Sequence, residues 1–93
     1  DLEAEPIVVE PDGAVLVAGR VNVERLEQAL EVALSERDNV DTVGGLVATA
    51  FGRVPRTGER IEFKGFVIEV VSAEHKRVNR VRFRRKPAQA EAS

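Results

Sequence analysis

The side chains that could perform catalysis are few and scattered along this chain. Its 93 residues include no cysteine and a single histidine, His75, which lies between two charged residues. Acyl or phosphoryl transfer needs a nucleophile with a base beside it, or two carboxylates that face each other across a pocket. The serines Ser35, Ser72 and Ser93 have no base near them in the sequence. We therefore predict no catalytic residue, and we expect His75 in an exposed turn.

A pair of glycines at an expected helix start could hold a small anionic ligand. Thr42, Gly44 and Gly45 precede an apolar helical pattern, and the backbone N–H groups at a helix start attract anions. Alternatively, the missing side chains allow another backbone to approach closely. No lysine, serine or aromatic platform accompanies the pair, which favours packing. We expect no cofactor, and these three residues remain the cofactor-binding candidates of the alternative interpretation.

Carboxylates in front of the same expected helix could supply oxygen ligands to a divalent cation. Glu36, Asp38 and Asp41 are the residues concerned. Their spacing matches no cation-binding loop, and acids before a helix start are common because the helix dipole favours them there. We therefore predict no metal site.

Three arginines alternate along the last expected strand, and they form the candidate interaction surface. Arg80, Arg82 and Arg84 would share one face of that strand. The favoured interpretation is a solvated face that discourages aggregation between strand edges. Contact with an acidic protein surface or with anionic lipid headgroups comes next. Nucleic-acid binding is not expected, because single-strand binders add stacking aromatic residues and this chain has only four phenylalanines as aromatic residues.

The positions of glycine, proline and the apolar residues predict the elements that hold these groups. Short apolar runs predict strands at 7–10 and 14–18, and alternation predicts strands at 60–63, 66–71 and 78–84. Asn22 is the expected cap of a first helix whose apolar stripe continues to Leu34, and Asp41 or Thr42 caps a second helix that stops at Gly52. The resulting order, β-β-α-α-β-β-β, predicts an α+β fold with an antiparallel or mixed five-stranded sheet and two helices.

Composition limits the chain to one small domain. Hydrophobic residues make up 43% and aromatic residues 4%, so we expect an aliphatic core. We place the domain at 7–86, between a flexible segment at 1–6 and a disordered tail at 87–93. No apolar run reaches the roughly 18–20 residues that a membrane span needs. The first residues are expected to continue a longer polypeptide.

Charge is unevenly distributed although the net charge is only −2. Residues 1–41 contain eleven acids and three bases, whereas residues 76–86 contain seven bases and no acid. Such polarity can orient a domain against a charged neighbour.

A spaced set of glycine and proline motifs carries a resemblance to a known family. The motifs are Asp41-Thr42-Val43-Gly44-Gly45-Leu46-Val47, Gly52-Arg53-Val54-Pro55 and Gly58-Glu59. With the strands around them, over about residues 8–84, the chain resembles the transporter-associated domain of the CorC/HlyC family. That domain follows tandem CBS domains in magnesium/cobalt efflux proteins and hemolysin-like membrane proteins.

This resemblance implies a fold similar to part of a flavin-binding domain, generally without a bound flavin. It implies a non-catalytic accessory domain that modulates magnesium or cobalt transport, or assembly, through contacts between domains. The alternative is a module that binds a flavin-like or nucleotide-like ligand. The implied partners are the CBS domains and membrane region of the parent chain, with an anionic membrane surface as a further candidate and homodimer formation left open. The implied location is the cytoplasmic face of the membrane, and the fragment alone is expected to be soluble.

Overall fold

The computed structural model describes residues 6–34 and 40–86, and it has one five-stranded sheet with two helices. The elements are β1 (Ile7–Val9), β2 (Val15–Ala18), α1 (Val23–Leu30), α2 (Val43–Phe51), β3 (Arg60–Phe63), β4 (Phe66–Glu74) and β5 (Arg77–Arg85). Every strand pair is antiparallel. The predicted α+β class and element order are confirmed.

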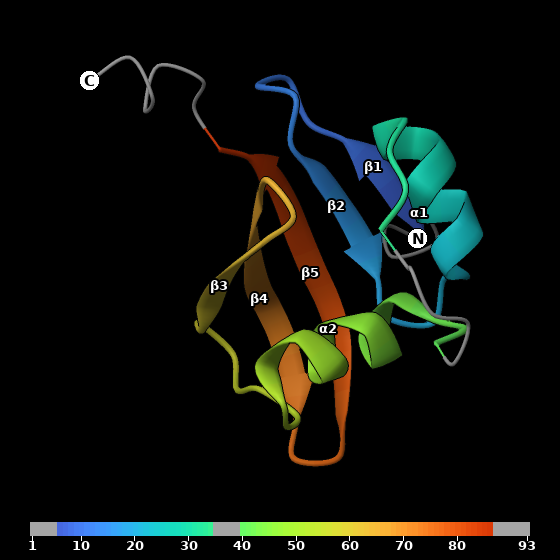
Figure 1. Ribbon diagram of the computed structural model, residues 1–93. Coiled ribbons are helices and arrows are strands. Elements are labelled where there is room, and N and C mark those ends of the chain that lie inside the picture. Colours follow the sequence, from blue (N-terminus) through green and yellow to red (C-terminus); the bar gives the residue numbers. More distant parts are fainter. Residues whose placement is uncertain (1–5, 35–39, 87–93) are drawn as a thin grey trace.

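The sheet has the order β1-β2-β5-β4-β3, so the last strand of the chain lies in its centre. β5 pairs with β2 through the register Val17↔Val81 and with β4 through Ile68↔Phe83. Figure 1 shows α2 across the front of the sheet and α1 beside it over the β1 and β2 side. The helices therefore cover one face of the sheet, and the opposite face carries the alternate side chains of each strand.

The core is aliphatic, as the composition predicted. Leu26, Val43, Val47 and Val81 are completely buried. Phe83 and Phe66 meet edge to face, with ring centroids 6.1 Å apart. Burying each such side chain contributes about 1.5–3 kcal/mol relative to exposure, so this single cluster holds both helices on the sheet.

The first helix is shorter than its apolar pattern suggested. Asn22 caps it as predicted, since its side chain accepts a 2.8 Å hydrogen bond from the Glu24 N–H. The expected continuation to Leu34 is wrong, because Glu31 adopts a left-handed conformation with φ of 62° and ends the helix. Leu34 is nevertheless buried. Its N–H donates a 2.8 Å hydrogen bond to the Glu27 carboxylate, which brings the chain back onto the core.

The last two strands are longer than predicted. The predicted ends of the strands at 66–71 and 78–84 are wrong where the two strands meet, because only His75 and Lys76 form the turn and the neighbouring residues belong to β4 and β5. The pairing continues past register shifts between Val70 and Ala73. The Ala73 N–H donates a 2.9 Å bond to the Thr57 hydroxyl, so the end of β4 has a partner outside the regular ladder.

The other predicted strand and helix boundaries lie within one residue of those in the structure. Thr42 caps α2 and Gly52 ends it with φ of 80°. The segments predicted as flexible at 1–6 and disordered at 87–93 fall outside the described residues, apart from Pro6. Within 6–34 and 40–86, neither helix has the length and apolarity required to cross a membrane.

Candidate functional site

Three backbone segments cross closely where β2 ends, α2 begins and β5 starts. The Gly44 N–H donates to the Gly19 carbonyl oxygen at 2.8 Å, and the Gly19 N–H donates to the Asn79 carbonyl oxygen at 2.8 Å. A Cβ atom at Gly19 would lie 2.1 Å from the Val78 carbonyl oxygen, and one at Gly44 would lie 3.2 Å from the Gly19 carbonyl oxygen. We call Gly19, Gly44 and the Val78 backbone the glycine junction. Packing excludes a side chain at Gly19, and at Gly44 a Cβ would need a small shift of the neighbouring backbone.

The first amides of α2 are already bonded within the protein. The Val43 N–H donates to the Val21 carbonyl oxygen at 2.8 Å, and the Gly45 N–H donates to the Thr42 hydroxyl at 3.1 Å. Together with the Gly44 bond, these interactions use the N–H groups that an anion at a helix start would need. A Cβ at Gly45 would make only ordinary contacts, 3.4 Å from the Thr42 hydroxyl. The expected close approach of a backbone is therefore present at Gly44 and absent at Gly45.

The structure brings the three cofactor-binding candidates together in one hollow. Thr42, Gly44 and Gly45 line a cavity of about 300 Å³. Three cations share its lining, namely Arg20, Lys76 and Arg77. Sequence reasoning did not connect these cations with the glycines. The sequence indicates that Arg20 lies near the junction, because it directly follows Gly19. It does not indicate that the β4–β5 turn, with Lys76 and Arg77, lies beside Arg20, because only the fold brings them together.

The arginine row lies on the sheet face opposite the helices, as predicted, and two of its three members are paired. The Arg82 guanidinium lies 2.8 Å from the Glu10 carboxylate and 3.2 Å from that of Glu69. Arg84 lies 2.6 Å from the carboxylate of Asp12. Glu10 precedes the turn between β1 and β2 and Asp12 lies in it, each 72 residues away from its arginine in the chain. We call these five residues the charged face.

Ionisation on the charged face follows from these contacts. Hydrogen bonds from Arg82 to Glu10 and Glu69 raise the pKa of Arg82. The pKa of Asp12 is lowered, first by the Ala14 backbone N–H and then by the Arg84 side chain. Arg80, the third member of the row, has no ion pair or side-chain hydrogen bond with any residue of 6–34 or 40–86. The row is thus largely an internal clamp between β5 and the first hairpin.

An ion pair outside the charged face explains the spacing of Gly52-Arg53-Val54-Pro55 and Gly58-Glu59. The Arg53 guanidinium donates two hydrogen bonds, of 2.8 and 2.5 Å, to the Glu59 carboxylate. The Arg56 backbone N–H donates a third, of 2.8 Å, to the same group. Arg53 first, and then the Arg56 N–H, lower the pKa of Glu59 to about 2. The carboxylate therefore closes the loop between α2 and β3, a role that the sequence analysis missed.

The other residues singled out from the sequence do not assemble into a reactive group within the described part of the chain. His75 is exposed in the turn between β4 and β5, as expected, and Asp41 is exposed before α2. Among residues 6–34 and 40–86, no three acidic or histidine side chains are grouped to hold a metal ion. The remaining candidates, Ser35, Glu36, Asp38 and Ser93, lie outside those ranges.

Comparison with known proteins identifies the same domain elsewhere. A family model described as "Transporter associated domain", CorC_HlyC, matches residues 8–87. A solved CorC_HlyC domain from Nitrosomonas europaea superposes with a TM-score of 0.81 at 29% identity, covering 88% of this chain and 98% of that one.

Three curated relatives are each 35% identical to this chain. The match to "Possible hemolysin C" of Rickettsia canadensis covers 94% of this chain and 30% of the relative. The match to the inner membrane protein YoaE of Escherichia coli K12 covers 88% of this chain and 16% of YoaE. The match to the magnesium and cobalt efflux protein CorC of the same strain covers 70% of this chain and 22% of CorC. The chain thus spans less than a third of the length of each of these relatives.

Proposed function

Because this chain belongs to the CorC_HlyC family of transporter-associated domains, we propose that it is a non-catalytic accessory domain of an ion-transporting membrane protein. In this proposal it modulates transport of magnesium or cobalt, or assembly of the transporter, through contacts with the rest of the parent protein. The CBS domains and the membrane region of the parent are the proposed partners, and the cytoplasmic face of the membrane is the proposed location.

One observation carries this proposal: the chain matches a solved domain of the family almost end to end, yet spans only 16–30% of its curated relatives. A folding unit of this size, with its own core, is able to act as a module within a longer protein. Thr42 caps a helix, Glu59 closes a loop and Arg82 forms ion pairs, which supports a structural role for these polar side chains rather than a chemical one.

Deleting the domain from its parent tests the proposal. Residues 8–87 are removed from the full-length protein, and magnesium and cobalt fluxes are measured in vesicles containing equal amounts of purified protein. Size-exclusion chromatography with light scattering reports assembly in parallel. We expect the deletion to change flux or oligomeric state while the membrane part remains folded. Unchanged flux and unchanged assembly would reject an accessory role.

A ligand-binding module is the second candidate, because Thr42, Gly44 and Gly45 line one hollow with three cations. This candidate needs groups other than the first α2 amides to hold a phosphate, since those amides are bonded to the protein. A thermal-shift screen with FMN, FAD, ADP and Mg²⁺ separates the two functions. Stabilisation that rises with ligand concentration would favour binding, and an unchanged Tm with every ligand would reject it.

A further inference from the structure

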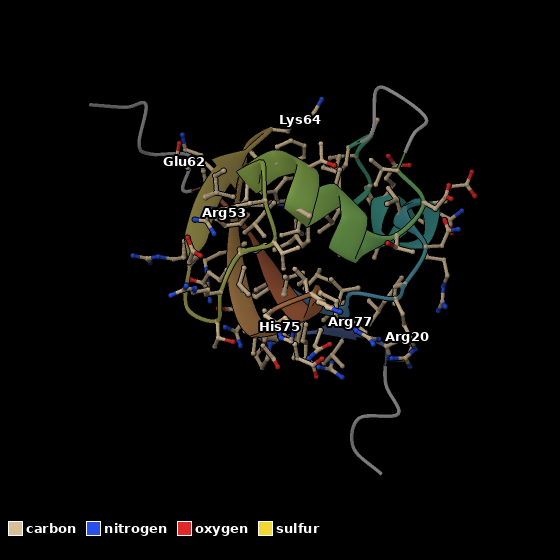
Figure 2. All side chains as sticks on the ribbon, turned by 90° about the horizontal axis from the view of Figure 1, so that it is seen from below. Arg20, Arg53, Glu62, Lys64, His75 and Arg77 are labelled. Carbon is tan, nitrogen blue, oxygen red and sulfur yellow. The ribbon has the colours of Figure 1, made fainter. Side chains whose placement is uncertain are left out.

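Five basic side chains gather at one end of the molecule, where three loops meet. Arg20 follows β2, Arg53 and Arg56 follow α2, and Lys76 and Arg77 lie at the β4–β5 turn. Two adjoining hollows, which share Val54, are lined by these side chains. Figure 2 looks onto this end and shows Arg53, His75, Arg77 and Arg20 spread across it. We call Arg20, Arg53, Arg56, Lys76 and Arg77 the basic end.

The basic end has few carboxylates to neutralise it. Among the residues that line its two hollows, the acids are Glu59 and Glu74. Glu59 is bound to Arg53 by two hydrogen bonds. Glu74 lies 4.0 Å from Arg77, with both side chains mostly exposed, at 62% and 75%. Such a contact is too long and too solvated to hold either group firmly.

Two of the cations have no polar partner in the described part of the chain. The side chains of Arg20 and Lys76 form no ion pair or hydrogen bond with residues 6–34 or 40–86. Arg82 on the charged face differs, since its side chain is 27% exposed and contacts two carboxylates. The cationic charge left without a partner is therefore concentrated at the basic end more than on the arginine row.

The chain also enters the domain at the end of the sheet where Arg20 lies. The Ala18 N–H donates a 2.9 Å bond to the Pro6 carbonyl oxygen, and Arg20 follows two residues after Ala18. Pro6 therefore pairs with the end of β2, two residues before Arg20. YoaE, one of the relatives, is an inner membrane protein.

We propose that the basic end is a docking surface for the anionic phosphate headgroups of the phospholipid bilayer in which the parent protein sits. The inference rests on the proposed function only in placing the domain near a membrane. Lipid fits this surface better than an acidic protein face does. The cations project from separate loops around hollows of about 300 and 1120 Å³, and mobile headgroups can adjust to them without a matching rigid surface.

The size of the effect follows from the charge. One basic side chain near an anionic leaflet raises partitioning about fivefold, so Arg20, Lys76 and Arg77 together contribute about 100-fold. The whole chain has a net charge of −2, so attraction depends on presenting this end to the surface. Binding should weaken steeply with salt, because the Debye length shortens from about 30 Å at 0.01 M to about 8 Å at 0.15 M.

Vesicle co-sedimentation of the 93-residue chain tests the proposal. Vesicles of phosphatidylcholine alone are compared with vesicles containing 40% phosphatidylglycerol, at low and at physiological salt. The test variant is Arg20→Ala/Lys76→Ala/Arg77→Ala. The matched control, Arg25→Ala/Arg60→Ala/Lys86→Ala, removes the same charge elsewhere. Circular dichroism melts establish that both variants fold.

We expect the unaltered chain and the control to bind the anionic vesicles at low salt, and the test variant to lose about 100-fold in partitioning. No binding to the anionic vesicles, equal binding to neutral vesicles, or equal loss in both variants would overturn the proposal. Retention on immobilised poly-glutamate without binding to vesicles would also overturn it, in favour of an acidic protein partner. A failed vesicle assay together with altered flux on domain deletion would reject the docking surface and leave the accessory role intact.

Discussion

The glycine junction and the charged face are held together in opposite ways. At the junction, backbones approach so closely that a Cβ at Gly19 would lie 2.1 Å from a carbonyl oxygen. On the charged face, Arg82 lies between two carboxylates with about a quarter of its side chain exposed. The junction therefore depends on missing atoms and cannot relax without moving backbone, whereas the face depends on flexible side chains that water can replace.

This difference shows which residues of the glycine and proline motifs are needed for folding. The junction joins the end of β2 to the start of α2 through the Gly44 to Gly19 hydrogen bond. Its glycines are accounted for by packing, without any ligand. Arg20 and Lys76, which have no polar partner in the described part of the chain, line the same hollow as the junction glycines, but their side chains are exposed.

Among the substitutions considered, we expect Gly19→Ala to cause the largest loss of stability. The added methyl group overlaps the Val78 carbonyl, so the two strands must separate. We expect a loss of about 3 kcal/mol or more in the free energy of unfolding, a large share of the roughly 5–15 kcal/mol of a typical domain. Urea denaturation at neutral pH measures it.

Gly45→Ala is the matched control, because it makes the same change one residue away from the junction. Its new Cβ makes only ordinary contacts, and alanine favours a helix by roughly 1 kcal/mol over glycine. The expected result is unchanged or slightly raised stability. Equal losses at Gly19 and Gly45 would contradict the assignment of the junction.

On the charged face, Arg82→Ala should have an intermediate effect. It leaves Glu10 and Glu69 close together without their shared cation, and we expect a loss of about 1 kcal/mol that shrinks in high salt. Arg80→Ala on the same strand face removes a cation without an ion pair, so its change should stay within about 0.5 kcal/mol. Thermal melts at 0.05 and 1 M NaCl compare the two, and similar losses would argue against the clamp.

The smallest effect concerns the Glu59 loop and depends on pH. The folded-state pKa of Glu59 is about 2, below the ordinary value of 4.5. A lowered pKa stabilises the fold above pH 4.5, and this contribution disappears as pH falls towards 2. Glu59→Gln should therefore be less stable than the unaltered chain at pH 6, and the difference should narrow in acid. A difference that stays constant from pH 6 to pH 2.5 would show that the carboxylate charge contributes nothing.

The sequence predicted most of the fold because local signals agree with the tertiary structure. Asn22, Thr42 and Gly52 cap or end their helices as predicted, and alternation placed Val81 and Phe83 in the core. It failed at Glu31, a non-glycine residue with positive φ. No local pattern distinguishes such an ending from a continuing helix, since the stripe of apolar residues extends beyond it.

The candidate surfaces were harder to predict because they depend on residues far apart in the chain. Arg82 and Arg84 look free in the sequence, but the sheet order places the first hairpin beside β5, where Glu10 and Asp12 meet them. Conversely, Arg20 and Lys76 are separated by more than fifty residues and become neighbours only through the fold.

The claim that the domain acts through contacts rather than chemistry is tested most directly by ion flux in the full-length parent. Flux is measured with the domain intact, with residues 8–87 deleted, and with the double change Ser72→Ala/His75→Ala, which removes its histidine and the serine nearest to it. The account predicts that the double variant transports like the intact protein while the deletion does not. A loss in the double variant as large as that of the deletion would contradict the account.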